Sequence, residues 1–89
     1  AEVELCRRWQ AQLAARLPAL RIRRNYPYRG RADGFATYLR RCFAPADYVG
    51  IELEVSQAQV ARRRAWPLLR QALVTTLDAA LAEQAQAAR

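Results

Sequence analysis

Two glutamates on one strand-like stretch are the first candidates for chemistry in this 89-residue chain. Glutamates alternate with apolar residues in Gly50-Ile51-Glu52-Leu53-Glu54-Val55. An extended chain has a side-chain period of two, so Glu52 and Glu54 would share one face, roughly 6–7 Å apart along the strand. Partial burial at the carboxyl end of such a strand would suit Glu54 for proton transfer. The alternative is a solvated strand face whose glutamates pair with nearby arginines.

A second candidate stretch is Asn25-Tyr26-Pro27-Tyr28-Arg29-Gly30, which reads as the loop after an earlier strand. Asn25, Tyr28 and Arg29 could present an amide, a hydroxyl and a guanidinium to a ligand. Arginine binds carboxylates through two parallel hydrogen bonds, so a substrate carboxylate is a natural partner. The alternative is an ordinary turn shaped by the proline and the glycine.

The periodicity of apolar residues predicts an α/β fold, with helices and strands in the order α-β-α-β-α. Two strands joined by a helix favour a parallel β-α-β unit, but two strands alone make a poor sheet. We therefore expect residues 1–89 to form a single partial domain, the C-terminal segment of a larger one. The expected helices cover 2–17, 35–42 and 66–82, and the expected strands cover 20–26 and 48–55. The apolar faces expected to be buried are Phe35, Tyr38, Leu39 and Cys42 in the second helix, and Leu69, Leu73, Leu77 and Leu81 in the last.

The two chemical stretches together resemble the C-terminal part of the N-formylglutamate amidohydrolase family. That family shows an Asn-x-Pro-aromatic-x-Gly loop, a Gly shortly afterwards, and an apolar strand that ends in Leu-Glu. Here the corresponding residues are 25–30, Gly34 and Leu53-Glu54, and the resemblance covers about residues 20–80. The family is similar in fold to the zinc carboxypeptidases.

The resemblance implies a zinc-dependent amidohydrolase that cleaves the amide of an N-formyl- or N-acyl-amino acid. It implies that Glu54 is the general base, that Glu52 supports it or contacts substrate, and that Asn25, Tyr28 and Arg29 contact substrate. The zinc ligands of the family include histidines from the upstream part of its chain, and this sequence contains none. Zinc is therefore expected as a cofactor held by upstream residues, and no metal ligand is assigned within these 89 residues.

Composition leaves two other function classes open. The formal net charge is +7 and all fifteen basic residues are arginine, which is compatible with a small nucleic-acid-binding or interaction module. The arginines are spread along the chain without a nucleic-acid-binding motif, which favours a small-molecule substrate and no nucleic-acid partner. Two cysteines without histidine cannot complete a four-ligand zinc site. No stretch predicts a membrane span or a signal peptide, so a cytoplasmic setting is expected.

Overall fold

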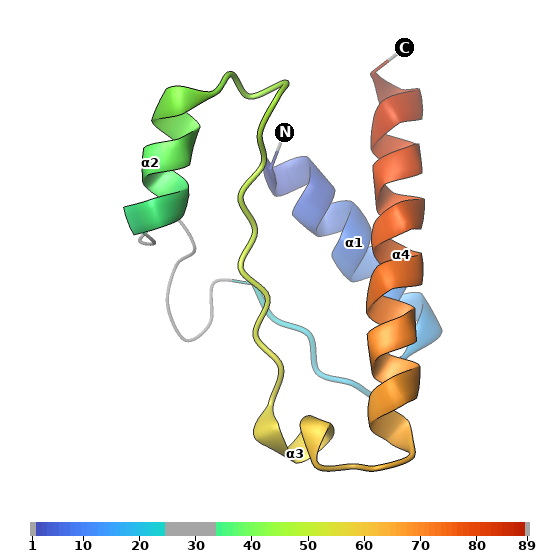
Figure 1. The fold of residues 1–89 in the computed structure, drawn as a ribbon. Coiled ribbons are helices and arrows are strands. Elements are labelled where there is room, and N and C mark those ends of the chain that lie inside the picture. The colour runs from blue at the N-terminus through green and yellow to red at the C-terminus, as the bar shows by residue number, and fades with distance from the viewer. Residues whose placement is uncertain (1, 25–33, 89) are drawn as a thin grey trace.

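Four helices make up the regular structure of the described part of the chain. The computed structural model describes residues 2–24 and 34–88, and no strand occurs among them. The helices are α1 (Glu2–Arg16), α2 (Gly34–Cys42), α3 (Gln57–Val60) and α4 (Ala65–Ala87). Helix α1 crosses α4, and an extended segment that begins after residue 47 and ends at α3 separates this pair from α2 (Figure 1).

The core of the protein is the contact between α1 and α4. Leu5 and Leu13 are the buried residues of α1 and lie two turns apart on one face. Leu69, Ala72, Thr76 and Ala80 are the buried residues of α4, and their spacing of three and four residues defines one helical face. The small alanines in this row let the two helix backbones approach each other closely. Only six side chains are buried among the described residues, so the core is thin.

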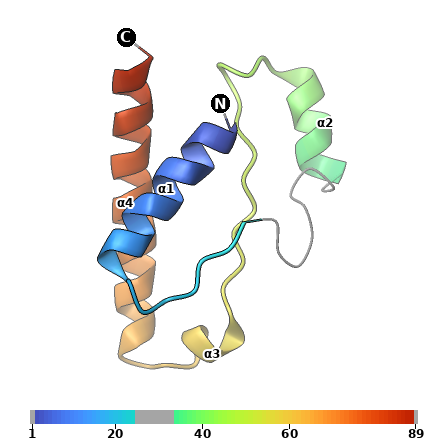
Figure 2. The same ribbon diagram turned by 180° about the vertical axis from the view of Figure 1, so that it is seen from behind.

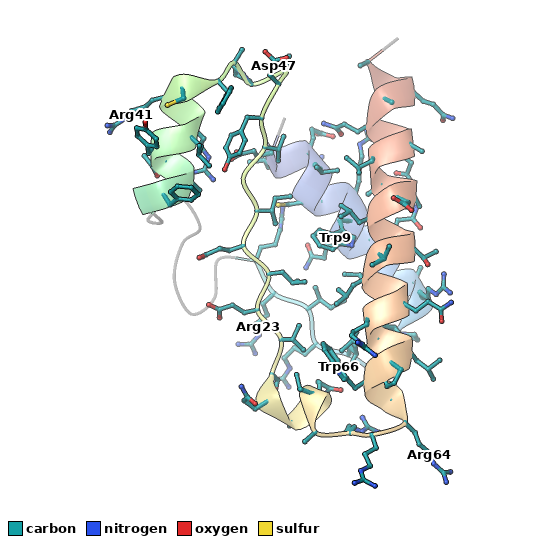
Figure 3. All side chains as sticks on the ribbon, viewed as in Figure 1. Trp9, Arg23, Arg41, Asp47, Arg64 and Trp66 are labelled. Carbon is teal, nitrogen blue, oxygen red and sulfur yellow. The ribbon has the colours of Figure 1, made fainter. Side chains whose placement is uncertain are left out.

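One polar contact ties the two helices together inside this core. The Trp9 indole Nε1 donates a hydrogen bond of 2.9 Å to the hydroxyl of Thr76, and that hydroxyl donates at 2.6 Å to the Ala72 carbonyl. Thr76 is only 2% exposed. Trp9 lies between α4 and the extended segment, where its ring also borders the space beside α1 (Figure 3). The hydroxyl therefore satisfies a tryptophan donor that water cannot easily reach.

The predicted α/β fold with parallel strands is wrong. Within residues 2–24 and 34–88 the structure is helical and has no sheet, although residues 20–24 and 48–56 are extended as expected. The two segments lack the regular ladder that defines a strand pair. Side chains bond to their backbone instead: Gln10 donates to the Ile22 carbonyl at 3.0 Å, and Glu2 accepts from the Gly50 N–H at 2.8 Å. Seen from behind, residues 18–24 cross the later segment rather than running beside it along its length (Figure 2).

Helices α1 and α2 lie close to their predicted positions, α4 continues past its predicted end at residue 82, and α3 was not among the expected helices. Some of the predicted faces are wrong. Phe35 and Tyr38 were expected inside, yet they are 71% and 59% exposed because no described element covers that side of α2. Leu81 is 46% exposed, and the buried row of α4 runs through alanines and a threonine rather than through four leucines. Leucine at every fourth position drifts around the helix, whereas a mixed spacing of three and four stays on one face.

We expect Thr76→Val to destabilise the protein by about 1–3 kcal/mol. The substitution keeps the shape of the side chain but leaves the Trp9 indole without its acceptor in a partly buried place. Urea unfolding followed by circular dichroism measures the loss. The neighbouring Thr75 is exposed, so Thr75→Val is the matched control and should change stability by less than about 0.5 kcal/mol. Equal effects of the two substitutions would contradict a specific role for the Trp9–Thr76 bond.

Candidate functional site

A large hollow lies between α1, α4 and the two extended segments, and we call it the central groove. Its volume is about 1300 Å³, and it is open to solvent along one side. Residues 20–24 form one wall and residues 50–56 form another, so two stretches about thirty residues apart in sequence face the same space. The helices contribute Cys6, Trp9, Gln10 and Leu13 from α1, and Leu69 and Leu73 from α4.

Glu52 and Glu54 both line the central groove, as their expected role requires. Both glutamates are exposed, so the partial burial expected of a proton-transfer carboxylate is absent among the described residues. Val49, Ile51 and Val55 are half-buried, but so are Tyr48 and Gly50, so burial does not follow the expected period of two along this segment. Leu53, which was expected on the buried face, is 51% exposed.

The loop candidates Asn25, Tyr28 and Arg29 lie outside the described residues. The described chain reaches Arg23 and Arg24, which immediately precede that loop and line the central groove with the two glutamates. The extended segments therefore bring the beginning of the loop stretch and the carboxylate stretch to one hollow. The described structure bears on no other part of the predicted arrangement between these two stretches.

Glu2 and Arg40 form an ion pair that holds Gly50, at the start of the segment that carries Glu52 and Glu54. We call this arrangement the clamp, and the sequence did not reveal it. The Glu2 carboxylate accepts two hydrogen bonds from the Nε of Arg40, at 2.8 and 3.0 Å, and one from the Gly50 N–H at 2.8 Å. Arg40 also donates to the Gly50 carbonyl at 3.1 Å. The clamp joins α1, α2 and the extended segment. Its members are 38 and 48 residues apart from Glu2, so no local pattern could have predicted it.

The clamp changes the titration of Glu2. Partial burial tends to raise the pKa of this carboxyl, but the bonds from Arg40 and Gly50 and the charge of Arg40 outweigh it. The net result is a pKa of Glu2 below its ordinary value. The folded state therefore stabilises the ionised form of the Glu2 carboxyl relative to the unfolded chain.

The space around position 50 favours glycine. A Cβ atom there would lie 2.9 Å from the Tyr48 hydroxyl and 3.2 Å from the Ala36 Cβ, so the Tyr48 side chain would have to shift and α2 would have to give way slightly. The absence of a side chain at residue 50 therefore lets the extended segment lie close to α2. The sequence placed this glycine in a strand, where its role in the close approach was not visible.

Cys6 is a further feature of the groove wall, and the sequence analysis gave it no role. Burial raises the pKa of the Cys6 thiol, and Glu2 adds to the rise, whereas Arg24 opposes both. The thiol therefore stays protonated at neutral pH and is a weak nucleophile. Cys42 is exposed on α2, and both cysteines are free.

The residues of this chain do not fit the zinc ion that the family resemblance implies. The sequence has no histidine, and the described residues contain no group of three or more cysteine, aspartate or glutamate side chains arranged to hold a metal.

Of the described helices, none combines the length and the apolar character needed to cross a membrane.

Comparisons with protein-family models, with curated proteins and with solved structures find no match to this chain. The resemblance to the N-formylglutamate amidohydrolase family therefore rests on the motif residues themselves.

The clamp predicts an acid-dependent loss of stability. Because the pKa of Glu2 is lowered in the folded state, its contribution is fully present above the ordinary value of 4.5 and is lost as the pH falls through the folded pKa. Glu2→Gln should cost about 1 kcal/mol at neutral pH, and its stability should converge with that of the unmodified protein in acid. Urea titrations at a series of pH values measure both effects.

Glu4→Gln is the control for the clamp. Glu4 lies in the same first turn of α1, but its side chain is 44% exposed, and among the described residues it pairs with its helix neighbours Arg7 and Arg8. A surface pair of this kind contributes little, so the substitution should leave the acid dependence intact. An acid profile that Glu2→Gln does not flatten would contradict the clamp.

The two cysteines should react at different rates. We expect Ellman's reagent to modify the exposed Cys42 at least about tenfold faster than Cys6, whose thiol is half-buried and has a raised pKa. Cys42→Ser should remove the fast phase, and Cys6→Ser the slow one. In denaturant the two rates should become similar, and a single rate in the folded protein would refute this assignment.

Proposed function

We propose that this chain supplies the proton-transfer and substrate-holding wall of an amidohydrolase that cleaves N-formyl- or N-acyl-amino acids. The metal ligands of such an enzyme would come from residues other than these 89, which form one partial domain of it. The observation that carries the proposal is the central groove, in which Glu52 and Glu54 share one hollow with Arg23 and Arg24, the start of the loop stretch.

Glu54 is the group assigned to proton transfer. It stands in the position of the Leu-Glu pair that the resemblance implies, and its exposed side chain is accessible to a water molecule in the groove. A carboxylate within hydrogen-bond reach of that water accepts its proton and later returns it to the leaving amine. Glu52, two residues earlier, contacts the substrate or orients Glu54.

The basic residues around the groove suit the other end of the substrate. An N-acyl-amino acid carries a free carboxylate, and a guanidinium binds a carboxylate through a planar pair of hydrogen bonds. Arg29, with Asn25 and Tyr28 beside it in the loop stretch, is assigned to this contact. The net charge of +7 also attracts an anionic substrate towards the chain.

The test uses a protein that contains this chain together with the metal-binding residues, assayed for release of the acyl group from N-formylglutamate. Glu54→Gln should lower kcat by about 10²- to 10⁴-fold while bound zinc stays at the level of the unmodified protein. Glu52→Gln should act mainly on KM. Glu4→Gln, outside the groove, is the control and should leave both constants unchanged. Undiminished turnover in Glu54→Gln with zinc retained would reject the proposed role.

A further inference from the structure

The outer face of α4 carries a line of exposed apolar residues. Val74 is 65% exposed and Leu81 is 46% exposed, and Pro67 is exposed as well. These residues are seven positions apart, which is about two turns of an α-helix, so they share one face, roughly opposite the buried row. Helix α1 crosses behind α4 in Figure 1 and in front of it in Figure 2, so the side of α4 remote from α1 faces outward.

Two opposite charges flank Val74 at equal distances along the helix. Arg70 lies four residues before it and Asp78 four residues after it, and both are exposed. Among the described residues, neither side chain forms an ion pair. The Arg70 guanidinium carbon lies 5.6 Å from the centre of the Trp66 ring. Stacking of this kind uses the face of a guanidinium, and the N–H groups in its plane can still bind a carboxylate.

This order of charges is self-complementary for two copies of α4 that run antiparallel. When a two-fold axis passes beside Val74, Arg70 of each copy lies level with Asp78 of the other. Pro67 of each copy then lies level with Leu81 of the other. A parallel pair in register would instead place each of the two charged residues beside its own counterpart, and like charges at such a contact are destabilising. The charges therefore favour one direction and one register.

Helix α4 also has little of the positive charge of the chain. Its charged residues are Arg70, Asp78 and Glu83, so its net charge is −1, from one arginine and two acidic residues. The whole chain carries +7, so the segments outside α4 together carry +8. Two copies that meet through α4 place nearly neutral surfaces at the contact, which limits the repulsion between them.

We propose that two copies of this chain pair through the outer faces of their α4 helices, antiparallel about a two-fold axis at Val74. Contacts among Pro67, Val74 and Leu81 supply the apolar attraction, and reciprocal ion pairs between Arg70 and Asp78 select the direction and the register. One helix from each copy makes a small interface, so the dimer forms at micromolar concentrations rather than permanently. None of these five residues lines the central groove, so the pairing is independent of the proposed hydrolase role.

Sedimentation equilibrium of the 89-residue chain should show monomer and dimer, with more dimer as the protein concentration rises. Arg70→Asp and Asp78→Arg should each weaken the dimer by at least about tenfold, because each substitution places like charges opposite each other. An equimolar mixture of the two variants should dimerise again, because every charge then meets its opposite. Recovery in the mixture also shows that neither variant fails by unfolding.

Two further substitutions assign the contact to this face. Val74→Arg places a charge at the two-fold axis and should abolish the dimer. Leu68→Arg adds the same charge at another exposed position of α4, where the leucine is 64% exposed, about a third of a turn around the helix. It should leave the dimer intact. Circular dichroism should show the same helix content in both variants.

Disulfide cross-linking tests the direction of the pair. In a chain that carries Cys6→Ser and Cys42→Ser, Val74→Cys should give a covalent dimer on oxidation with glutathione disulfide, because the axis brings the two copies of position 74 together. Leu81→Cys should not cross-link, because antiparallel pairing places the two copies of position 81 roughly 20 Å apart, too far for a disulfide.

Four outcomes would overturn the proposal. One is a chain that stays monomeric at every concentration, which would leave this face to other residues of a longer protein. Another is a dimer that survives Val74→Arg. The third is a mixture of the two charge-reversed variants that stays monomeric. The last is cross-linking at position 81 as fast as at position 74, which would indicate a parallel pair.

Discussion

The packing of α1 against α4 is the contact on which the rest of the molecule depends. Leu5 and Leu13 lie against the alanine-lined face of α4, and the bond from Trp9 to Thr76 fixes how the helices meet. Trp9 and Leu13, which take part in this packing, also line the central groove. Rotating α1 would therefore disturb the core and the groove together.

The Glu2 clamp explains how a strand-like segment keeps its extended form outside a sheet. In a sheet, neighbouring strands satisfy the backbone groups and hold the chain straight. Here one carboxylate and one guanidinium bind both backbone groups of Gly50, and the cap of α3 at Ser56 secures the other end. The segment is thus anchored at both of its ends.

The open groove and the exposed glutamates bear on the proposed hydrolase role. Glu52 and Glu54 are both in contact with solvent. Closing an active site expels water and strengthens the electrostatic interactions inside it. An enzyme that uses this wall would therefore cover the groove with residues other than these 89.

Sequence alone determined where α1 and α2 lie, where α4 begins, and that residues 48–55 are extended, because these follow from local periodicity and from prolines and glycines that end elements. It also identified Glu52 and Glu54 as neighbours on one stretch. The sequence could not predict strand pairing, because the alternation that predicts a strand does not say whether a neighbouring strand exists. Here side chains form hydrogen bonds with the backbone of Ile22 and Gly50 instead. Only the tertiary structure decided that Phe35 is exposed, that Thr76 is buried, and that Glu2 meets Arg40 and Gly50. Each of these depends on contacts between residues distant in the chain, which no local pattern records.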